Sequence, residues 1–338
     1  MNNTLDIYNP LISKIVAGTE GKIILIHSKE RKLGKTKVGT DLPKPFYLRF
    51  EQGLNAIGNI PYVALTSWSD FKKVNKQLTN PKTLDKVKEM YQTIIFDTVD
   101  VAIKWCDFYV CATQGVKRIN DGNEGFGLWK EYENEWFKEI NALTNAGFCV
   151  YFIAHSEIAT QTDPETGEEY DQLVPKGDKR TIDLICDIAD FIGYVKSNGI
   201  DENGEKKLSS VYFAPTKEFL AGSRFEYMPA KLKVFSAENL QNAIKLAIEK
   251  EEAEGNQVFN FDEQKEYEVT DKYTYDEIIE EIKKLFSSLW DNHSDKISEI
   301  VEEYLGKDGK ISETTKKQMP QLEMILYDLQ ELNSDING

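Results

Sequence analysis

The stretch Lys22-Ile-Ile-Leu-Ile-His27, followed by a polar loop that ends in Gly34-Lys35-Thr36, decides the fold of this 338-residue chain. A short apolar run without polar alternation is typical of a strand that is buried on both faces of a parallel sheet. The Gly-Lys-Thr triplet is the second half of a phosphate-binding loop, in which backbone N–H groups at a helix N-terminus face the phosphates. The order strand, loop, helix therefore predicts a phosphate-binding α/β domain.

The side chains of this loop have separate expected roles. Lys35 would reach the β and γ phosphates of ATP, and the Thr36 hydroxyl would bind Mg²⁺. The predicted nucleotide-binding segment comprises Lys32, Leu33, Gly34, Lys35, Thr36 and Lys37. Lys29 stands where the pattern G-x-x-x-x-G-K-[ST] has its first glycine, and a residue with a side chain resists the positive φ that the loop can need. The triplet alone is also compatible with a surface turn.

Other short apolar runs predict further buried strands, at residues 46–50, 62–65, 93–96, 148–154, 190–195 and 209–214. Helical patterns lie between them, the clearest at Lys130 to Ala146, where Gly147 supplies the stop. Strands that alternate with helices form βαβ units, so the central sheet is expected to be mostly parallel.

Three of these strands end in a polar side chain. Asp97 follows Thr93-Ile-Ile-Phe and would hold the Mg²⁺ water shell, and Glu51 follows Phe46–Phe50, where it could activate the attacking water. His155 follows the run that ends at Ala154. Ligands of open α/β sheets bind at the carboxyl ends of the strands. Each residue alone is more often a simple strand terminator, but the ordered set favours a nucleotide site.

The charge is concentrated at the C-terminal end. The chain carries a net charge of −16, and residues 249–338 hold 24 acidic and 10 basic residues, which leaves the preceding part near neutrality. Helical patterns at 242–254, 275–290, 296–305 and 312–332 predict an acidic helical appendage. We therefore expect an ATP-binding core at 1–240, a charged helix and linker at 241–273, and an acidic helical unit at 274–338.

Composition excludes other classes. The four cysteines have apolar neighbours and no C-x-x-C spacing, which indicates reduced core residues and no zinc site. No apolar run approaches the roughly 20 residues that a membrane helix requires, and the start of the chain lacks the pattern of a signal peptide. A cytoplasmic protein without membrane association is expected.

Several motifs in order resemble the RecA-like ATPase domain of phage nucleotide-binding proteins, an AAA-type group that includes the Sak-type ATP-dependent single-strand annealing proteins. The resemblance covers about residues 20 to 235. It rests on Gly34-Lys35-Thr36, Phe50-Glu51-Gln52-Gly53-Leu54, Ile94-Ile95-Phe96-Asp97-Thr98, Gly127-Leu-Trp129, Val150-Tyr-Phe-Ile-Ala-His155, Asp187-Ile-Ala-Asp-Phe-Ile-Gly-Tyr194 and Ala221-Gly-Ser-Arg224.

The resemblance implies a RecA-like P-loop fold and a homo-oligomer, either a ring or a filament, that binds single-stranded DNA (ssDNA) in phage recombination. It implies Asp97 as the Walker B acid, Glu51 as the catalytic carboxylate and His155 as the γ-phosphate sensor. Arg224 would act across a subunit interface on the neighbour's transition state. One of the two cations expected there is replaced in Gly222-Ser223-Arg224, so hydrolysis could be slow.

By the same resemblance, ssDNA would contact two long loops, at residues 112–127 and 156–180. Their cationic candidates are Lys117, Arg118, Lys176, Lys179 and Arg180. The second loop is rich in carboxylates, so a solvated loop without a role in DNA binding remains an equal alternative.

Two functional questions remain open at this level. The chain is either an annealing ATPase or a nucleotide-gated oligomeric binding or regulatory protein with little hydrolysis. The acidic tail either restrains ssDNA binding by the core or docks a partner such as a single-strand binding protein.

Overall fold

The computed structural model describes residues 10, 12–177, 179–263 and 274–337. The chain forms two compact units, Leu11–Tyr267 and a second unit that joins Met1–Pro10 with Glu268–Gly338. Each has a hydrophobic core of its own. No helix among the described residues is both long enough and apolar enough to cross a bilayer.

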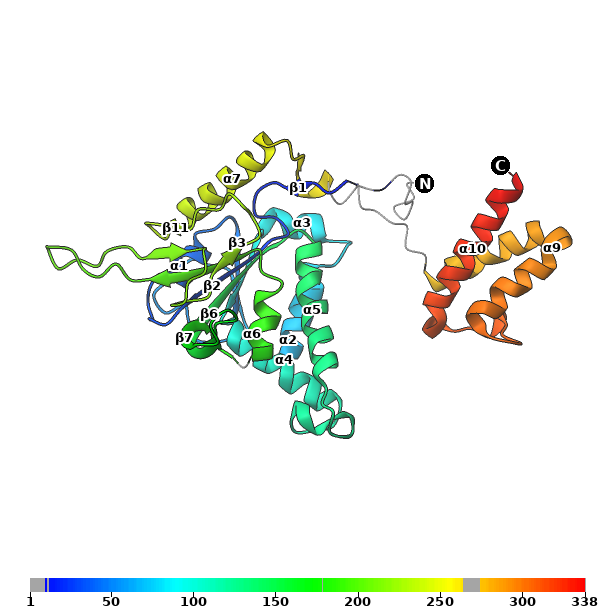
Figure 1. Ribbon diagram of the computed structural model, residues 1–338, viewed down its shortest axis with the longest axis horizontal. Helices are drawn as coiled ribbons and strands as arrows, with labels where there is room; N and C mark the ends of the chain where they lie inside the picture. The colour runs from blue at the N-terminus through cyan, green and yellow to red at the C-terminus, as the bar shows by residue number, and fades with distance from the viewer. Residues whose placement is uncertain (1–9, 11, 178, 264–273, 338) are drawn as a thin grey trace. The chain divides into compact units, whose positions relative to one another are not determined.

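The larger unit is built on a 10-stranded sheet (Figure 1). Its centre is a run of parallel strands in the order β8-β2-β6-β5-β3-β4, which confirms the predicted mostly parallel sheet. These strands are β8 (Phe191–Lys196), β2 (Ile23–Ser28), β6 (Cys149–Thr162), β5 (Thr93–Asp97), β3 (Pro45–Arg49) and β4 (Tyr62–Ala64). The antiparallel strands are β9 (Ser210–Tyr212), β10 (Gly222–Ser223) and β11 (Lys231–Leu232) beyond β8, and β7 (Glu169–Pro175) beside β6.

Helices cover both faces of this sheet, which explains the unbroken apolar strands. Ile23 and Leu25 of β2 point into one hydrophobic cluster, and Ile24 and Ile26 point into another. The helices are α1 (Lys35–Thr40), α2 (Trp68–Leu78), α3 (Leu84–Met90), α4 (Val99–Thr113), α5 (Trp129–Asn145), α6 (Lys179–Cys186) and α7 (Ala237–Ala253). The helix expected at 130–146 is α5, and it ends just before Gly147, whose φ is 89°.

The prediction of a long loop at 156–180 is wrong, because β6 continues to Thr162 and pairs with β7 as an antiparallel hairpin. The Asp163 carboxylate accepts the backbone N–H groups of Glu165 and Thr166 at 3.0 and 3.2 Å and so forms the turn. The chain then enters α6. The segment 112–127 is irregular apart from the end of α4 and the short helices η1 (Ile119–Asp121) and η2 (Asn123–Gly125).

The charged helix expected from residue 242 begins earlier, at Ala237, where the Ser236 side chain accepts the N–H of Asn239 at 3.1 Å. Its apolar face packs on the sheet. The following strand β12 (Val258–Phe259) pairs with β1 (Ile15–Val16). Phe261 then packs closely on Gly21 and Gly147, where an added Cβ would lie 2.7 and 2.8 Å from its ring. The expected linker therefore starts inside the larger unit, and its residues 264–273 lie outside the described part of the chain.

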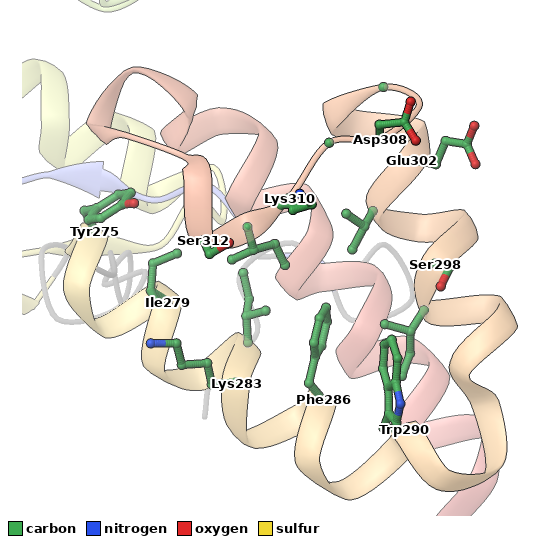
Figure 2. A pocket seen from close by; sticks show the side chains of 16 residues that line it. Tyr275, Ile279, Lys283, Phe286, Trp290, Ser298, Glu302, Asp308, Lys310 and Ser312 are labelled. Atoms are coloured by element: carbon green, nitrogen blue, oxygen red, sulfur yellow. The ribbon is translucent and has the colours of Figure 1, made fainter.

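The C-terminal unit is helical and acidic, as the sequence predicts. The two helices expected at 275–290 and 296–305 form one element, α9 (Tyr275–Leu305), bent at His293, whose φ is −138°. The short helices η3 (Ile311–Glu313) and η4 (Lys316–Gln318) lead to α10 (Met319–Asn337), which packs against α9. An apolar groove of about 700 Å³ lies beside Phe286 and Trp290 of α9, and Figure 2 shows the side chains that line it.

Candidate nucleotide-binding site

A cavity of about 990 Å³ lies at the carboxyl ends of the central parallel strands. It is lined by the loop between β2 and α1, by the segment that follows β3, by the start of α4 and by the base of the β6–β7 hairpin. The strand ends that the sequence singles out thus meet in one place. The candidate residues that line the cavity are Lys32, Leu33, Gly34, Lys35, Thr36, Lys37, Glu51, Asp97, His155 and Lys176.

The loop presents an open helix end to this cavity. Gly34 caps α1 with φ 90° and, as a glycine, offers no side chain to the first N–H groups of the helix. The Lys35 ammonium donates to the Ser28 hydroxyl at 2.5 Å, while the Tyr151 hydroxyl donates to the Lys35 carbonyl at 3.1 Å. Burial lowers the pKa of Lys35 to about 8, against the raising effect of the Asp97, Asp100 and Glu51 carboxylates. A bound polyanion would restore the charge on this ammonium.

Asp97 stands opposite the loop and holds two hydroxyl groups. Its Oδ2 atom accepts from the Thr36 hydroxyl at 2.8 Å and from the Tyr47 hydroxyl at 2.7 Å. Gly53 passes so close that an added Cβ would lie 2.2 Å from the Tyr47 oxygen. A threonine hydroxyl and a carboxylate beside a phosphate loop are oxygen ligands of the kind that Mg²⁺ takes, so the residues present fit this ion.

Glu51 faces the cavity from the segment after β3, and His155 faces it from within β6, where the parallel pairing with β2 ends, and not from the strand end that the sequence predicts. Burial raises the pKa of Glu51. The His155 Nδ1 atom lies 3.2 Å from the Asp100 Oδ2 atom, and this hydrogen bond raises the pKa of His155. Asp100 is buried, and its other oxygen, Oδ1, lacks a hydrogen-bond partner within the described residues. A buried carboxylate oxygen that faces a polar cavity is suited to accept a hydrogen bond from a bound ligand or its water shell.

Comparison with known proteins identifies the family at this point. Residues 21–225 match the AAA domain family, a span that contains every cavity residue named above. The chain belongs to this family. Over 330 residues the AAA protein is also 44% identical to the SPbeta prophage-derived uncharacterized protein YorG of Bacillus subtilis (strain 168), which covers 97% of this chain and 98% of the relative. The likeness therefore extends through the helical unit.

Three residues of the site in the AAA domain, two of which line the cavity, were not predicted from the sequence. Asp100 lies three positions after Asp97, at the start of α4, and this second carboxylate was an available signal. Tyr47 lies inside an apolar strand and resembles a core residue. Ser156 was hidden in the expected loop, and its hydroxyl lies 2.9 Å from the Nδ1 atom of buried His27, whose Nε2 atom lies 2.7 Å from the Leu220 carbonyl. Because burial lowers the pKa of His27 to about 4, neutral His27 donates to Leu220 and accepts from Ser156.

The five residues expected at ssDNA come from three segments of the AAA protein. Lys176 lines the nucleotide cavity, and its N–H donates to the His155 carbonyl at 2.8 Å. Lys179 pairs with Asp183 at 2.9 Å, and the Arg180 guanidinium lies 4.0 Å from the centre of the Trp129 ring. Lys117 and Arg118 lie on a separate, exposed segment before η1. Their role in DNA binding stays a prediction.

Arg224 lies at the opposite edge of the AAA domain. Its guanidinium donates to the Asp187 carbonyl and lies 3.5 Å from Asp190, which binds the N–H of Ile23 at the amino end of β2. The Arg224 side chain is 57% exposed and does not line its own nucleotide cavity. A role in its own site is therefore not supported by its position.

Proposed function

We propose that this protein is a Mg²⁺-dependent ATPase of a phage. The observation that carries the proposal is the meeting of Lys35 and Thr36, at the open end of α1, with Asp97 and Glu51 in one cavity. Cations and N–H groups on one side suit a triphosphate, and the carboxylates on the other suit its metal and its attacking water. The prophage origin of the 44% identical relative supports the phage setting.

Each side chain has a distinct task in this reaction. Lys35 and the N–H groups of α1 bind the phosphates, and Thr36 and Asp97 hold Mg²⁺. The ion supplies charge neutralisation at the β and γ phosphates. Glu51 accepts a proton from the attacking water, and its raised pKa makes it a stronger base than an exposed glutamate. His155, held by Asp100, donates a hydrogen bond to the transferred phosphate.

The finer proposal is that the ATPase works as a homo-oligomer on ssDNA, as an annealing protein of recombination. The ordered motifs quoted from the sequence support it, and so does the exposed position of Arg224, which is free to meet a neighbouring subunit's cavity. The second candidate function is a nucleotide-gated binding protein. It is motivated by Lys29, which stands in place of the first loop glycine and so departs from the motif of a hydrolysing site.

The decisive experiment measures binding of a fluorescent ATP analogue, with and without Mg²⁺, and then the rate of phosphate release. We expect Lys35→Ala to weaken binding by about a hundred-fold, since it removes a buried charge-assisted contact. Lys245→Ala is the matched control, because Lys245 is exposed, already pairs with Glu249 and does not line the cavity. Equal affinity of parent and Lys35→Ala proteins would refute the site. Binding without turnover, with or without ssDNA, would select the nucleotide-gated alternative.

A further inference from the structure

A second cavity, of about 510 Å³, lies between β11 and the exposed side of α7, and we call it the lysine groove. Its lining includes Tyr227, Lys231, Lys233, Val234, Leu246 and Lys250. It shares no residue with the nucleotide cavity. Among the described residues that line it, three are lysines and none is acidic, although the chain as a whole carries a net charge of −16. The groove itself is therefore positively charged.

The three lysines of the groove are exposed. Within the part of the chain that the structure describes, none of them forms an ion pair. Instead, the Lys231 ammonium lies 4.7 Å from the centre of the Tyr212 ring, and the Lys250 ammonium lies 5.9 Å from that of Tyr227. Aromatic contacts orient an ammonium without cancelling its charge. These cations are thus available to phosphates.

The floor of the groove is apolar and open to solvent. Leu246 is 56% exposed and Val234 is 36% exposed, and the Tyr227 ring lies beside them in the lining. The backbone at Lys233 is fixed, because its carbonyl accepts from the buried Ser210 hydroxyl at 3.0 Å. The groove thus combines cations with an aromatic ring and apolar side chains. Single-stranded nucleic acid binds to such a surface, because its phosphates contact the cations and its bases stack on the ring.

We propose that the lysine groove is a binding site for single-stranded nucleic acid, with Lys231, Lys233 and Lys250 on phosphates and Tyr227 under a base. The proposal rests on the ssDNA role given under the proposed function, and it places the contact away from the β6–β7 hairpin. That hairpin carries Glu165, Glu168, Glu169 and Asp171, which oppose phosphate. The carboxylates of Glu226, Glu251 and Glu254 lie near Tyr227 and would repel phosphates at that end of the groove. The nucleic-acid strand would therefore run toward Lys231 and Lys233.

The test measures anisotropy of a labelled oligothymidine with the full-length protein over a range of salt concentrations. We expect Lys231→Ala/Lys233→Ala/Lys250→Ala to reduce affinity at least about ten-fold at low salt and to reduce the slope of log K against log salt by about 2, as three lost phosphate contacts require. The control, Lys76→Ala/Lys82→Ala/Lys86→Ala, removes the same charge from exposed positions that have no expected role in DNA binding, and it should leave the slope unchanged. ATP binding by both variants verifies their folding.

A second variant separates base contact from charge. Tyr227→Leu should weaken the affinity for ssDNA about ten-fold and leave the salt dependence of binding unchanged, because base stacking releases no counterions. If the triple lysine variant bound ssDNA as tightly as the parent, the lysine groove would not be the binding site, and the proposed function would be unaffected. Equal losses in the triple variant and its control would also overturn it, as a general charge effect. Absence of ssDNA binding by the parent, with ATP binding intact, would reject both the groove and the ssDNA role and favour an acidic protein partner.

Discussion

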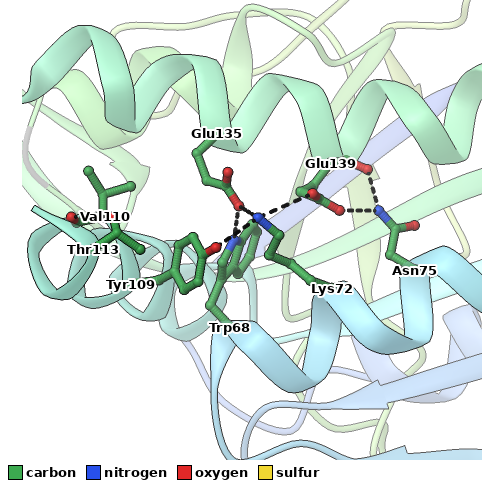
Figure 3. Close-up of polar contacts among 8 residues, drawn as sticks. All are labelled: Trp68, Lys72, Asn75, Tyr109, Val110, Thr113, Glu135 and Glu139. Atoms are coloured by element: carbon green, nitrogen blue, oxygen red, sulfur yellow. Dashed lines mark hydrogen bonds and ion pairs between the residues drawn. The ribbon is translucent and has the colours of Figure 1, made fainter.

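Two groups of charged side chains in the larger unit are balanced in different ways. In the nucleotide cavity, burial lowers the pKa of Lys35 and raises that of Glu51, and Asp100 keeps an oxygen without a partner in the described residues. The second group, between α2, α4 and α5, is shown in Figure 3, where Lys72 of α2 points toward Glu135 and Glu139 of α5.

The second group satisfies its own charges. The Lys72 ammonium lies 2.6 Å from Glu135 and donates to the Tyr109 hydroxyl at 3.1 Å, while the Trp68 indole N–H donates to the same glutamate at 2.8 Å. Burial alone would lower the pKa of Lys72, but these hydrogen bonds raise it to about 12. Charges that complete one another stabilise a fold, whereas charges left incomplete are available to a ligand.

The largest effect is expected for Glu51→Gln, which keeps the shape of the side chain and deletes the base. Turnover should fall by about 10²- to 10⁴-fold, the usual contribution of a positioned general base, while ATP affinity and melting temperature stay near the parent values. Phosphate release measures turnover, titration calorimetry measures ATP affinity, and scanning calorimetry measures the melting temperature. Undiminished turnover would show that Glu51 does not activate the water.

Arg224→Ala tests whether the cavity is completed by a neighbouring subunit. We expect hydrolysis to fall by about ten- to a hundred-fold, and mixing with Glu51→Gln protein to restore part of the rate, because hybrid interfaces pair an intact Glu51 with an intact Arg224. The restored rate should rise with protein concentration as assembly does. Mixtures that co-assemble without any recovery would rule out action in trans.

Lys72→Met tests the second group, in which the charges of Lys72, Glu135 and Glu139 are paired with one another. It leaves Glu135 and Glu139 side by side without their cation, so the free energy of unfolding should fall by about 2 kcal/mol, less than for a fully buried pair. ATP affinity should not change. Denaturant unfolding monitored by circular dichroism gives the first quantity. A loss of ATP binding in a folded variant would contradict the separation of the two groups.

The smallest effect concerns the pH dependence of the Asp100–His155 pair. Because the hydrogen bond to Asp100 raises the pKa of His155, the pair stabilises the fold fully below the ordinary histidine pKa and loses this contribution as pH rises through the raised value. Asp100→Asn should move the His155 titration to lower pH. With three histidines in the chain, an NMR titration assigned with His155→Gln follows it directly. An unchanged titration of His155 in Asp100→Asn protein would show that Asp100 does not raise the pKa of His155.

The sequence was informative where the signal is local. Each apolar run with a terminal polar residue predicted a strand and a cavity residue, because parallel strands bring their carboxyl ends to one edge. The prediction failed at residues 156–175, because their acidic turn resembles a loop while pairing between β6 and β7 depends on partners 7 to 19 positions apart. The lysine groove was equally hidden, because Lys231 and Lys250 come together only when α7 packs on the sheet.

Phe261 has a consequence for how such proteins can exchange their tails. Its ring fills a space left by two glycines, Gly21 and Gly147, at the start of β2 and the end of α5. A genetic crossover upstream of this residue would remove part of the packing of the AAA domain together with the tail. A crossover downstream of Phe261 would leave this packing complete. We therefore expect the helical unit to be exchanged between relatives after Phe261, with a bulky aromatic residue kept wherever the two glycines are kept.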